Sequence, residues 1–318
     1  MFVSVLLFIF GLLLLIKGGD WFVDAASSIA HRLHMPELLI GATVVSIGTT
    51  LPEVMVSAQG AMVGSGSIAF GNAIGSIICN TSLIAAITLV VCPSRVERKT
   101  LLLPSIAFFV AAAFYCFNAY VYGAFSRMSG LILLTMFVVY MVLTIMQMKN
   151  PAFAPKETDE EVVPETTMGH DIVMLIVGAA VIVVGARLLV DNAQVIARAL
   201  GVPESVIALT LVALGTSLPE LVTAITSLIK GCGALSLGNI IGANLFNLVL
   251  VSGTAITISP FNLASASATS LVIDIPLMLG VMLIMTVPAL TREKMSRWQG
   301  VVLLCCYAAY CTFLFFIA

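Results

Sequence analysis

This sequence of 318 residues contains very little charge. Only 9% of its residues are Asp, Glu, Lys or Arg, whereas 60% are hydrophobic. Soluble domains are typically about one-quarter charged, because their surfaces face water. The scarcity of charge therefore excludes an ordinary soluble protein and favours a lipid bilayer as the environment. The net charge of −2 gives no indication of a nucleic-acid partner, and we expect none.

The residue patterns of metal sites and of common active sites are also missing. Seven cysteines lie in or beside apolar stretches, without the paired spacing of a zinc site. The sequence has no His-x-x-x-His pair and no Ser/His or paired-Asp arrangement typical of an intramembrane enzyme. We therefore expect neither an enzyme activity nor a bound cofactor.

Long apolar stretches make up most of the chain. Each is about 17 to 25 residues long, the length that a helix needs to cross the hydrocarbon core of a bilayer. The sequence therefore predicts an all-α membrane protein with ten transmembrane helices. The ten stretches cover residues 2–24, 37–63, 67–92, 101–118, 124–148, 171–197, 204–229, 234–258, 267–289 and 298–317.

Lysine and arginine are distributed unevenly between the loops. If the N-terminus is outside, ten of the fourteen basic residues lie in cytoplasmic loops. Because positively charged loops stay on the cytoplasmic side, we expect both termini outside. Lys17 and Arg187 fall within apolar segments, and we expect them near helix ends, where a long side chain reaches the interface.

The chain contains an internal repeat. Residues 149–169 are rich in Pro, Glu and Thr and are predicted to be a cytoplasmic linker between residues 1–148 and 170–318. A shift of 167 positions aligns 41–80 with 208–247, and 14 of the 40 pairs are identical, including Gly, Pro, Asn and Glu. Each half has five predicted helices, an odd number, so the two five-helix repeats are expected to be inverted in the membrane.

Matched polar motifs interrupt the second and seventh apolar segments. They read SIGTTLPE at Ser46–Glu53 and ALGTSLPE at Ala213–Glu220. Proline removes a helical hydrogen bond and frees the carbonyl four residues earlier. We therefore expect broken helices at the membrane midplane that present carbonyl, hydroxyl and carboxylate oxygens. Hard cations such as Ca²⁺ prefer this set of oxygen ligands.

Glu53 and Glu220 are the acidic residues at matched positions in the middle of apolar segments. A carboxylate at this depth is costly unless a cation, a proton or water accompanies it. No Lys or Arg lies deep enough to be an obvious partner, so a divalent cation or several monovalent cations are expected. A protonated pair that only joins helices is the structural alternative.

A second polar motif recurs at Gly71–Asn80 and Gly238–Asn247. Its glycines permit close approach of helices, and Ser76 and Asn80 share one helical face. Ser76, Asn80 and Asn247 are candidates to complete an ion shell. Small and amide residues also join membrane helices without binding ions, and this alternative stays open.

With these motifs the whole chain resembles the sodium/calcium exchanger family of cation/calcium antiporters. The resemblance implies a core of helices 2, 3, 7 and 8, against which helices 1 and 6 slide during alternating access. It implies a Ca²⁺ site made by Glu53, Glu220 and the main-chain oxygens of Thr49 and Thr216. It implies Na⁺ sites made by Thr49, Thr50, Ser76, Thr216, Ser217 and the carbonyls of Ser46 and Ala213, with Asn80 facing the centre.

Two positions depart from the family pattern. Ala243 stands where the first repeat has Ser76, so one Na⁺ site lacks a hydroxyl. Asn247 replaces the aspartate of potassium-dependent relatives, which argues against K⁺ co-transport. The short linker resembles that of bacterial or archaeal members, which implies a cytoplasmic membrane.

The function expected from these features is exchange of Ca²⁺ for several Na⁺, with Glu53 and Glu220 as shared ligands. A Ca²⁺/H⁺ antiporter that uses the same carboxylates is the alternative, and Ala243 leaves room for it. A cation channel is a further class, disfavoured by broken inverted repeats. The sequence leaves the oligomeric state open, a monomer included.

Overall fold

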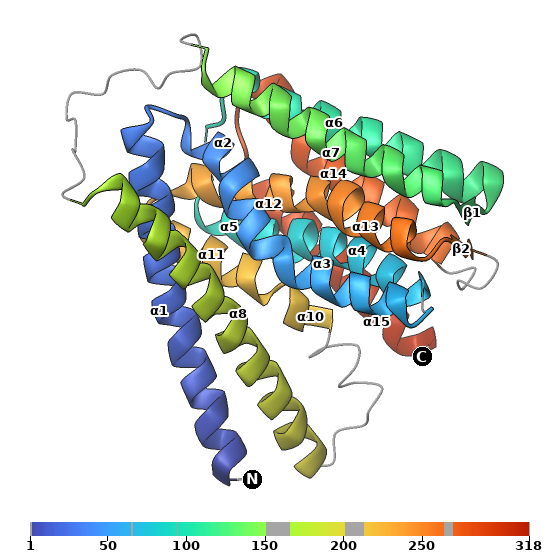
Figure 1. Cartoon of the computed structure of the whole chain (residues 1–318), viewed down its shortest axis with the longest axis horizontal. Helices are drawn as coiled ribbons and strands as arrows, with labels where there is room; N and C mark the ends of the chain where they lie inside the picture. The colour runs from blue at the N-terminus through green and yellow to red at the C-terminus, as the bar shows by residue number, and fades with distance from the viewer. Residues whose placement is uncertain are drawn as a thin grey trace.

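The computed structural model describes residues 2–64, 66–93, 95–150, 166–200, 213–263 and 270–317. Most of these residues are helical (Figure 1). Within these ranges, eight helices are long and apolar enough to cross a membrane, which makes this a multi-pass membrane protein. They are Phe2–Arg32, Glu37–Met62, Phe70–Val91, Arg98–Tyr122, Arg127–Met148, Met168–Ala199, Gly233–Ile258 and Leu271–Arg292.

Several of these spans are divided into shorter elements, because π-helical turns interrupt the α-helix. The described α-helices are α1 (Phe2–Arg32), α2 (Glu37–Ile40), α3 (Ser46–Met62), α4 (Gly66–Cys79), α5 (Ala86–Val91), α6 (Arg98–Phe117), α7 (Arg127–Met148), α8 (Met168–Ala199), α10 (Ala213–Thr216), α11 (Leu218–Ile229), α12 (Gly233–Phe246), α13 (Ser252–Ile258), α14 (Ile275–Arg292) and α15 (Arg297–Ile317). The π-helical turns are η1 (Gly41–Val45), η2 (Asn80–Ala85), η3 (Asn118–Tyr122), η6 (Asn247–Val251) and η8 (Ser270–Asp274).

The expected helix breaks differ between the two halves. In the second half the helix is interrupted at Ser217, between α10 and α11, and Pro219 lies in the first turn of α11. In the first half the expectation is wrong, because α3 continues through Pro52 from Ser46 to Met62. The irregular turn there is η1, which ends directly before Ser46. A widened turn of this kind can absorb the distortion that a proline introduces.

The first and sixth segments are longer than their apolar stretches. α1 runs to Arg32 and α8 begins at Met168. Lys17 therefore lies in the middle of α1, and Arg187 lies within α8, so their expected place near helix ends is wrong. Both side chains are exposed on the outside of the helices. α1 continues past Lys17 because no proline follows before Pro36.

The centre of the molecule is α12, in which every residue from Leu235 to Phe246 is buried. It packs against α2, η1, α3 and α11. Gly238 permits this packing, because a Cβ atom there would lie 2.1 Å from the carbonyl oxygen of Leu38. α12 is therefore enclosed by other helices, and polar residues on it face protein.

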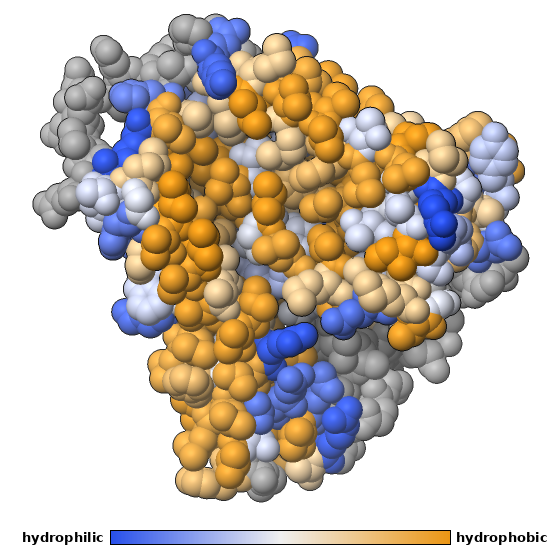
Figure 2. All heavy atoms as spheres, viewed as in Figure 1, coloured by the Kyte–Doolittle hydropathy of each residue, from blue (hydrophilic) through white to orange (hydrophobic). Residues whose placement is uncertain are grey.

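α1 and α8 form a closely packed antiparallel pair at one side of the molecule (Figure 1). A Cβ atom on Gly178 would lie 2.8 Å from the backbone nitrogen of Phe22, and one on Gly185 would lie 2.9 Å from the Gly11 oxygen. Figure 2 shows hydrophobic residues over much of α1, as expected for a surface that faces lipid. Small residues allow helices in a membrane to pack this closely.

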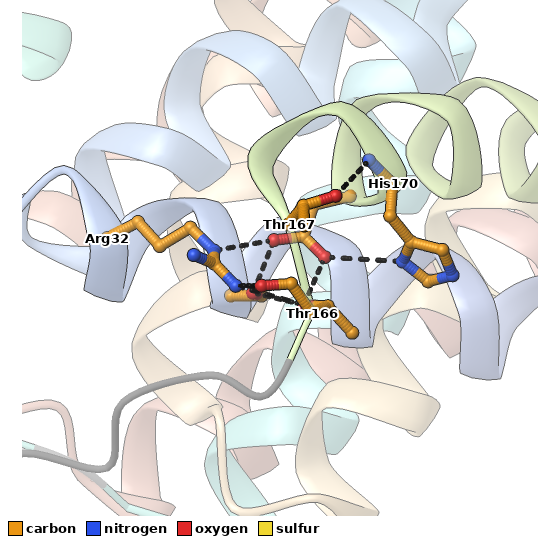
Figure 3. A network of polar contacts seen from close by, with 6 residues as sticks. Arg32, Thr166, Thr167 and His170 are labelled. Atoms are coloured by element: carbon orange, nitrogen blue, oxygen red, sulfur yellow. Dashed lines mark hydrogen bonds and ion pairs between the residues drawn. The ribbon is translucent and has the colours of Figure 1, made fainter.

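A polar network joins the end of α1 to the start of α8 (Figure 3). The Asp171 carboxylate is almost fully buried and accepts hydrogen bonds from Arg32 at 2.9 Å, Ser28 at 2.6 Å and Thr166 at 2.6 Å. Arg32 also donates to the backbone oxygen of Thr166. His170 lies on the other side of the carboxylate, 3.6 Å away. The network ties α1 and the residues that precede α8 together.

Replacing Arg32 with Ala is expected to lower the free energy of unfolding by about 2 kcal/mol, because a buried carboxylate loses its ionic partner. The double variant Arg32→Ala/Asp171→Asn should lose less, because no buried charge then remains without compensation. Thermal unfolding of the purified protein in detergent measures both. A double variant less stable than Arg32→Ala alone would contradict this account.

Candidate ion-binding site

Glu53 on α3 and Glu220 on α11 lie in the interior of the protein. Both side chains have no exposed surface, and the two carboxylates lie within electrostatic range of each other. None of their four carboxylate oxygens has a hydrogen-bond partner among the described residues. Among the described residues, no Lys, Arg or His forms a salt bridge with either glutamate. The two predicted carboxylates are thus both buried within electrostatic range of each other, and no cationic side chain among the described residues pairs with either.

Further polar side chains without hydrogen-bond partners occur at matched repeat positions. Thr50 and Ser217 are a repeat pair, and both hydroxyls are buried and unpartnered in the described structure. Asn80 and Asn247 are another pair, and neither polar atom of either amide is satisfied by a described group. These two asparagines are also the first residues of the π-helical turns η2 and η6. π-Helical turns are frequent at functional sites.

Buried polar atoms without partners are rare in folded proteins, and each costs about 1–3 kcal/mol. Their repetition in both halves of the chain makes an accidental origin a poor explanation. Two carboxylates, hydroxyl oxygens and amide oxygens are a donor set suited to hard cations such as Ca²⁺ or Na⁺. The arrangement therefore fits a cation-binding centre better than a packing contact between helices.

The Thr49 hydroxyl, unlike that of Thr50, has a hydrogen-bond partner. It donates to Oδ1 of Asn239 at 3.1 Å and lies near the Glu220 carboxylate without a hydrogen bond to it. Ser46 uses its hydroxyl within the protein, donating to the backbone oxygens of Gly41 at 2.7 Å and Asn239 at 2.9 Å. The resemblance assigns only the Ser46 carbonyl to an ion, and in this structure that carbonyl accepts a long hydrogen bond of 3.5 Å from the Thr49 hydroxyl.

The remaining predicted residues are described to different extents. Ser76 is buried, and Thr216 is half-buried at the end of α10. Ala213 is the first residue of α10, and only its backbone is described. No described contact joins these three residues to the two glutamates, so their ligand roles stay predictions.

Asn72 and Asn239 are site-supporting residues to which the sequence analysis gave no separate role. Nδ2 of Asn72 donates to the backbone oxygen of Glu53 at 3.3 Å and to the Ser57 hydroxyl at 2.9 Å. Asn239 instead accepts from Thr49 of the other half. Their identity at matched repeat positions was the signal that could have found them. Their different contacts show that the two halves of the site are not equivalent.

A cavity of about 850 Å³ is lined by none of these residues. It is next to the short antiparallel pair of β1 (Ala124–Phe125) and β2 (Phe261–Asn262) and is lined mainly by aromatic and polar residues of α6, η3 and α7. No predicted ion ligand lines it. The two glutamates are closed off from the surface in this conformation, consistent with their complete burial.

The family model described as sodium/calcium exchanger protein matches residues 3–146 and 170–316, which together make up most of the chain. The chain belongs to the sodium/calcium exchanger family. This is a family of transporters rather than of enzymes, and the resemblance seen in the sequence motifs is confirmed. The two matched ranges leave out the residues between 146 and 170.

Relatives of this exchanger-family member cover most or nearly all of its length. Sodium/calcium exchanger MaX1 of Methanosarcina acetivorans is 32% identical over 99% of both chains. Putative antiporter CaxA of Alkalimonas amylolytica is 35% identical over 99% of both chains. Inner membrane protein YrbG of Escherichia coli is 37% identical over 82% of this chain and 81% of its own.

Solved structures of the sodium-calcium exchanger NCX_Mj share this fold. One, soaked with Na⁺ and Sr²⁺, has a TM-score of 0.79 and 31% sequence identity to this chain, and the match covers 97% of both chains. Another, soaked with Na⁺ and Ca²⁺, has the same TM-score and identity. The fold of this exchanger-family member is therefore that of a known membrane exchanger.

Proposed function

We propose that this protein is a secondary active antiporter that exchanges Ca²⁺ for several Na⁺ by alternating access, with Glu53 and Glu220 as shared ligands. The observation that carries the proposal is the set of buried oxygens without partners at matched repeat positions. Membership of the exchanger family supports it. So do the names of a relative, sodium/calcium exchanger MaX1, and of the structurally similar sodium-calcium exchanger NCX_Mj.

The coupling mechanism follows from charge. Two carboxylates can neutralise one Ca²⁺ or hold several Na⁺, but they cannot balance both loads together in a low-dielectric interior. Binding of one ion type therefore excludes the other. A site with bound ions is nearly neutral, so the protein can switch the site from one membrane face to the other. A site with two bare carboxylates should resist this switch, which limits uncoupled movement of the empty carrier.

We further propose ten membrane crossings in two inverted five-helix repeats, residues 1–148 and 170–318, joined by the linker 149–169. The eight long apolar helices support this arrangement. The interrupted α10–α11 pair and the apolar helix α15 supply candidates for the other two crossings. Most of the linker, 151–165, lies outside the described residues.

The proposed location is the cytoplasmic membrane, with both termini outside. The relative YrbG, which is named an inner membrane protein, supports the location. The orientation rests on the distribution of lysine and arginine alone.

A Ca²⁺/H⁺ antiporter is the second candidate. Ala243, which is fully buried, supplies no hydroxyl where the first half has Ser76, so the two flanks of the centre differ. The unpartnered hydroxyls of Thr50 and Ser217 favour Na⁺, because protons on carboxylates would need no such oxygen shell.

An imposed Na⁺ gradient at clamped pH is expected to drive ⁴⁵Ca²⁺ uptake into vesicles at a rate at least about tenfold above that with a choline gradient, because choline cannot occupy an oxygen-lined site for Na⁺. The same vesicles under a pH gradient without Na⁺, and under a K⁺ gradient, are the controls. Uptake driven by the pH gradient but not by Na⁺ would establish the second candidate instead.

A further inference from the structure

Two buried hydroxyls outside the proposed ion site also lack hydrogen-bond partners. Ser227 on α11 and Ser236 on α12 are both fully buried, and neither hydroxyl is satisfied within the described ranges. The backbones of both serines form hydrogen bonds with the backbone of Cys232. The Cys232 N–H donates to the Ser227 oxygen at 2.7 Å, and the Ser236 N–H donates to the Cys232 oxygen at 3.3 Å. The two serines therefore flank the same tight turn between α11 and α12.

The serines are in helical register with the ion site. Ser227 follows Glu220 by seven residues, nearly two helical turns, so both lie on one face of α11. Thr223 lies between them, buried, with its hydroxyl bonded to the Pro219 oxygen at 2.8 Å. Ser236 precedes Ala243 by the same interval on α12. A polar stripe thus extends roughly 10 Å from the carboxylate to the turn.

The first half of the chain has no hydroxyl at the three aligned positions, although Ser57, one turn after Glu53, is a buried hydroxyl that Asn72 satisfies. The positions aligned with Thr223, Ser227 and Ser236 are Val56, Gly60 and Ala69. The hydroxyls are therefore not a general requirement of packing in this repeat. They belong to the end of the site that leads toward the turn 230–232.

Acidic groups surround this turn. Lys230 contacts Asp24 at 2.7 Å and Asp20 at 3.6 Å. The Cys232 thiol donates to the Ser27 hydroxyl at 3.7 Å, and Ser27 donates to Glu37 at 3.2 Å. Three carboxylates against the Lys230 ammonium give the surroundings of the turn a local excess of negative charge. Such an excess raises the local concentration of cations.

α1 covers this end of α11. A Cβ atom on Gly19 would lie 2.8 Å from the Thr226 hydroxyl and from Val222, so the two helices touch there. The Lys230 ammonium also donates to the backbone oxygen of Asp20 at 3.3 Å. α1 is thus held against α11 by close packing and by an ion pair at the turn.

We propose that Ser227 and Ser236 line the route by which ions pass between Glu220 and the membrane face that carries the turn 230–232, and that α1 closes this route in the present conformation. The inference rests on the proposed transport function. A passing cation and its water supply the partner that both hydroxyls lack within the protein. By the distribution of lysine and arginine this face is cytoplasmic.

The double variant Ser227→Ala/Ser236→Ala tests the route. Na⁺-driven Ca²⁺ exchange is expected to fall about fivefold to tenfold, whereas equilibrium Ca²⁺ binding, followed by thermal stabilisation, should change less than about twofold. Lower equilibrium affinity would make the serines ligands, and an unchanged rate would remove them from the route; either result overturns the inference. Ser105→Ala is the matched control, because it deletes another buried, unpartnered hydroxyl, on α6. An equal loss of rate in this control would also overturn the inference.

Labelling tests the route without transport, so its outcome is independent of which ion drives exchange. A single cysteine is placed by Ser227→Cys or Ser236→Cys in a chain whose seven cysteines are replaced and which still exchanges ions. It should react with a membrane-impermeant thiol reagent from one face only. A separate variant that keeps Cys92 as its single cysteine identifies that face, because Cys92 is exposed and its sulfur lies 4.0 Å from the Cβ position of Gly233. Reaction from the opposite face, no reaction, or equal reaction of Ser105→Cys would overturn the inference.

Discussion

Glu53→Gln and Glu220→Gln are each expected to reduce Na⁺-driven Ca²⁺ uptake by at least about 100-fold. Glutamine keeps the size of the side chain but removes the charge that binds the ion. Two opposite unit charges about 4 Å apart attract by about 4 kcal/mol at the effective dielectric of a protein, which corresponds to far more than tenfold in affinity. Because neither carboxylate has a partner in the described structure, no other group compensates for its loss.

Loss of transport in these variants should not reflect unfolding. In the absence of ions, each substitution removes repulsion between two buried carboxylates, so the midpoint of thermal unfolding should stay unchanged or rise. Added Ca²⁺ should raise that midpoint for the unchanged protein but not for either variant, since only a bound ion stabilises the folded state. Ca²⁺ transport retained in either variant would defeat the assignment of these glutamates.

The position of the two glutamates could be predicted because the repeat conserves residues that are uncommon in apolar membrane helices, such as proline and glutamate. Pro52 and Pro219 align, as do Glu53 and Glu220, whereas apolar helices match only in general character. Their place in the protein interior then follows from the medium, because a carboxylate in the middle of an apolar segment is too costly to face lipid. Sequence and solvent together were enough to predict that these carboxylates meet inside the protein.

Contacts between the halves could not be predicted in this way. Asn72 supports Glu53 within its own half, whereas its repeat mate Asn239 bonds Thr49 of the other half. Identical residues take different partners because the packing of α12 against α3 decides which groups are within reach. The alignment of the repeats contains no information about that choice.

The ends of helices could be predicted only approximately, for a related reason. The first apolar stretch ends near residue 24, whereas α1 continues to Arg32. The polar half of α1 is stabilised by partners distant in sequence, Lys230 for Asp24 and Asp171 for Arg32. Similarly, α3 runs through Pro52 because its surroundings hold the helix together despite one missing hydrogen bond. Tertiary contacts outweighed local sequence signals in both cases.

Removing the two unpartnered site hydroxyls is expected to weaken Na⁺ binding more than Ca²⁺ binding. Thr50→Val/Ser217→Ala keeps the shape of each side chain nearly unchanged but deletes both oxygens. An interaction between a hydroxyl and a charged group contributes about 1.5–3 kcal/mol. The Na⁺ concentration for half-maximal exchange should therefore rise at least about tenfold. Ca²⁺ affinity should fall less, because the two carboxylates supply most of its binding energy.

Vesicle exchange measured over a range of Na⁺ concentrations, with Ca²⁺ binding followed by thermal stabilisation, separates the two effects. Ser105→Ala is again the control for loss of a buried hydroxyl, and it should change neither quantity. Parallel weakening of Na⁺ and Ca²⁺ binding would mean that the hydroxyls shape the site as a whole. An unchanged Na⁺ dependence would show that neither hydroxyl binds Na⁺ and would contradict their proposed role as ligands.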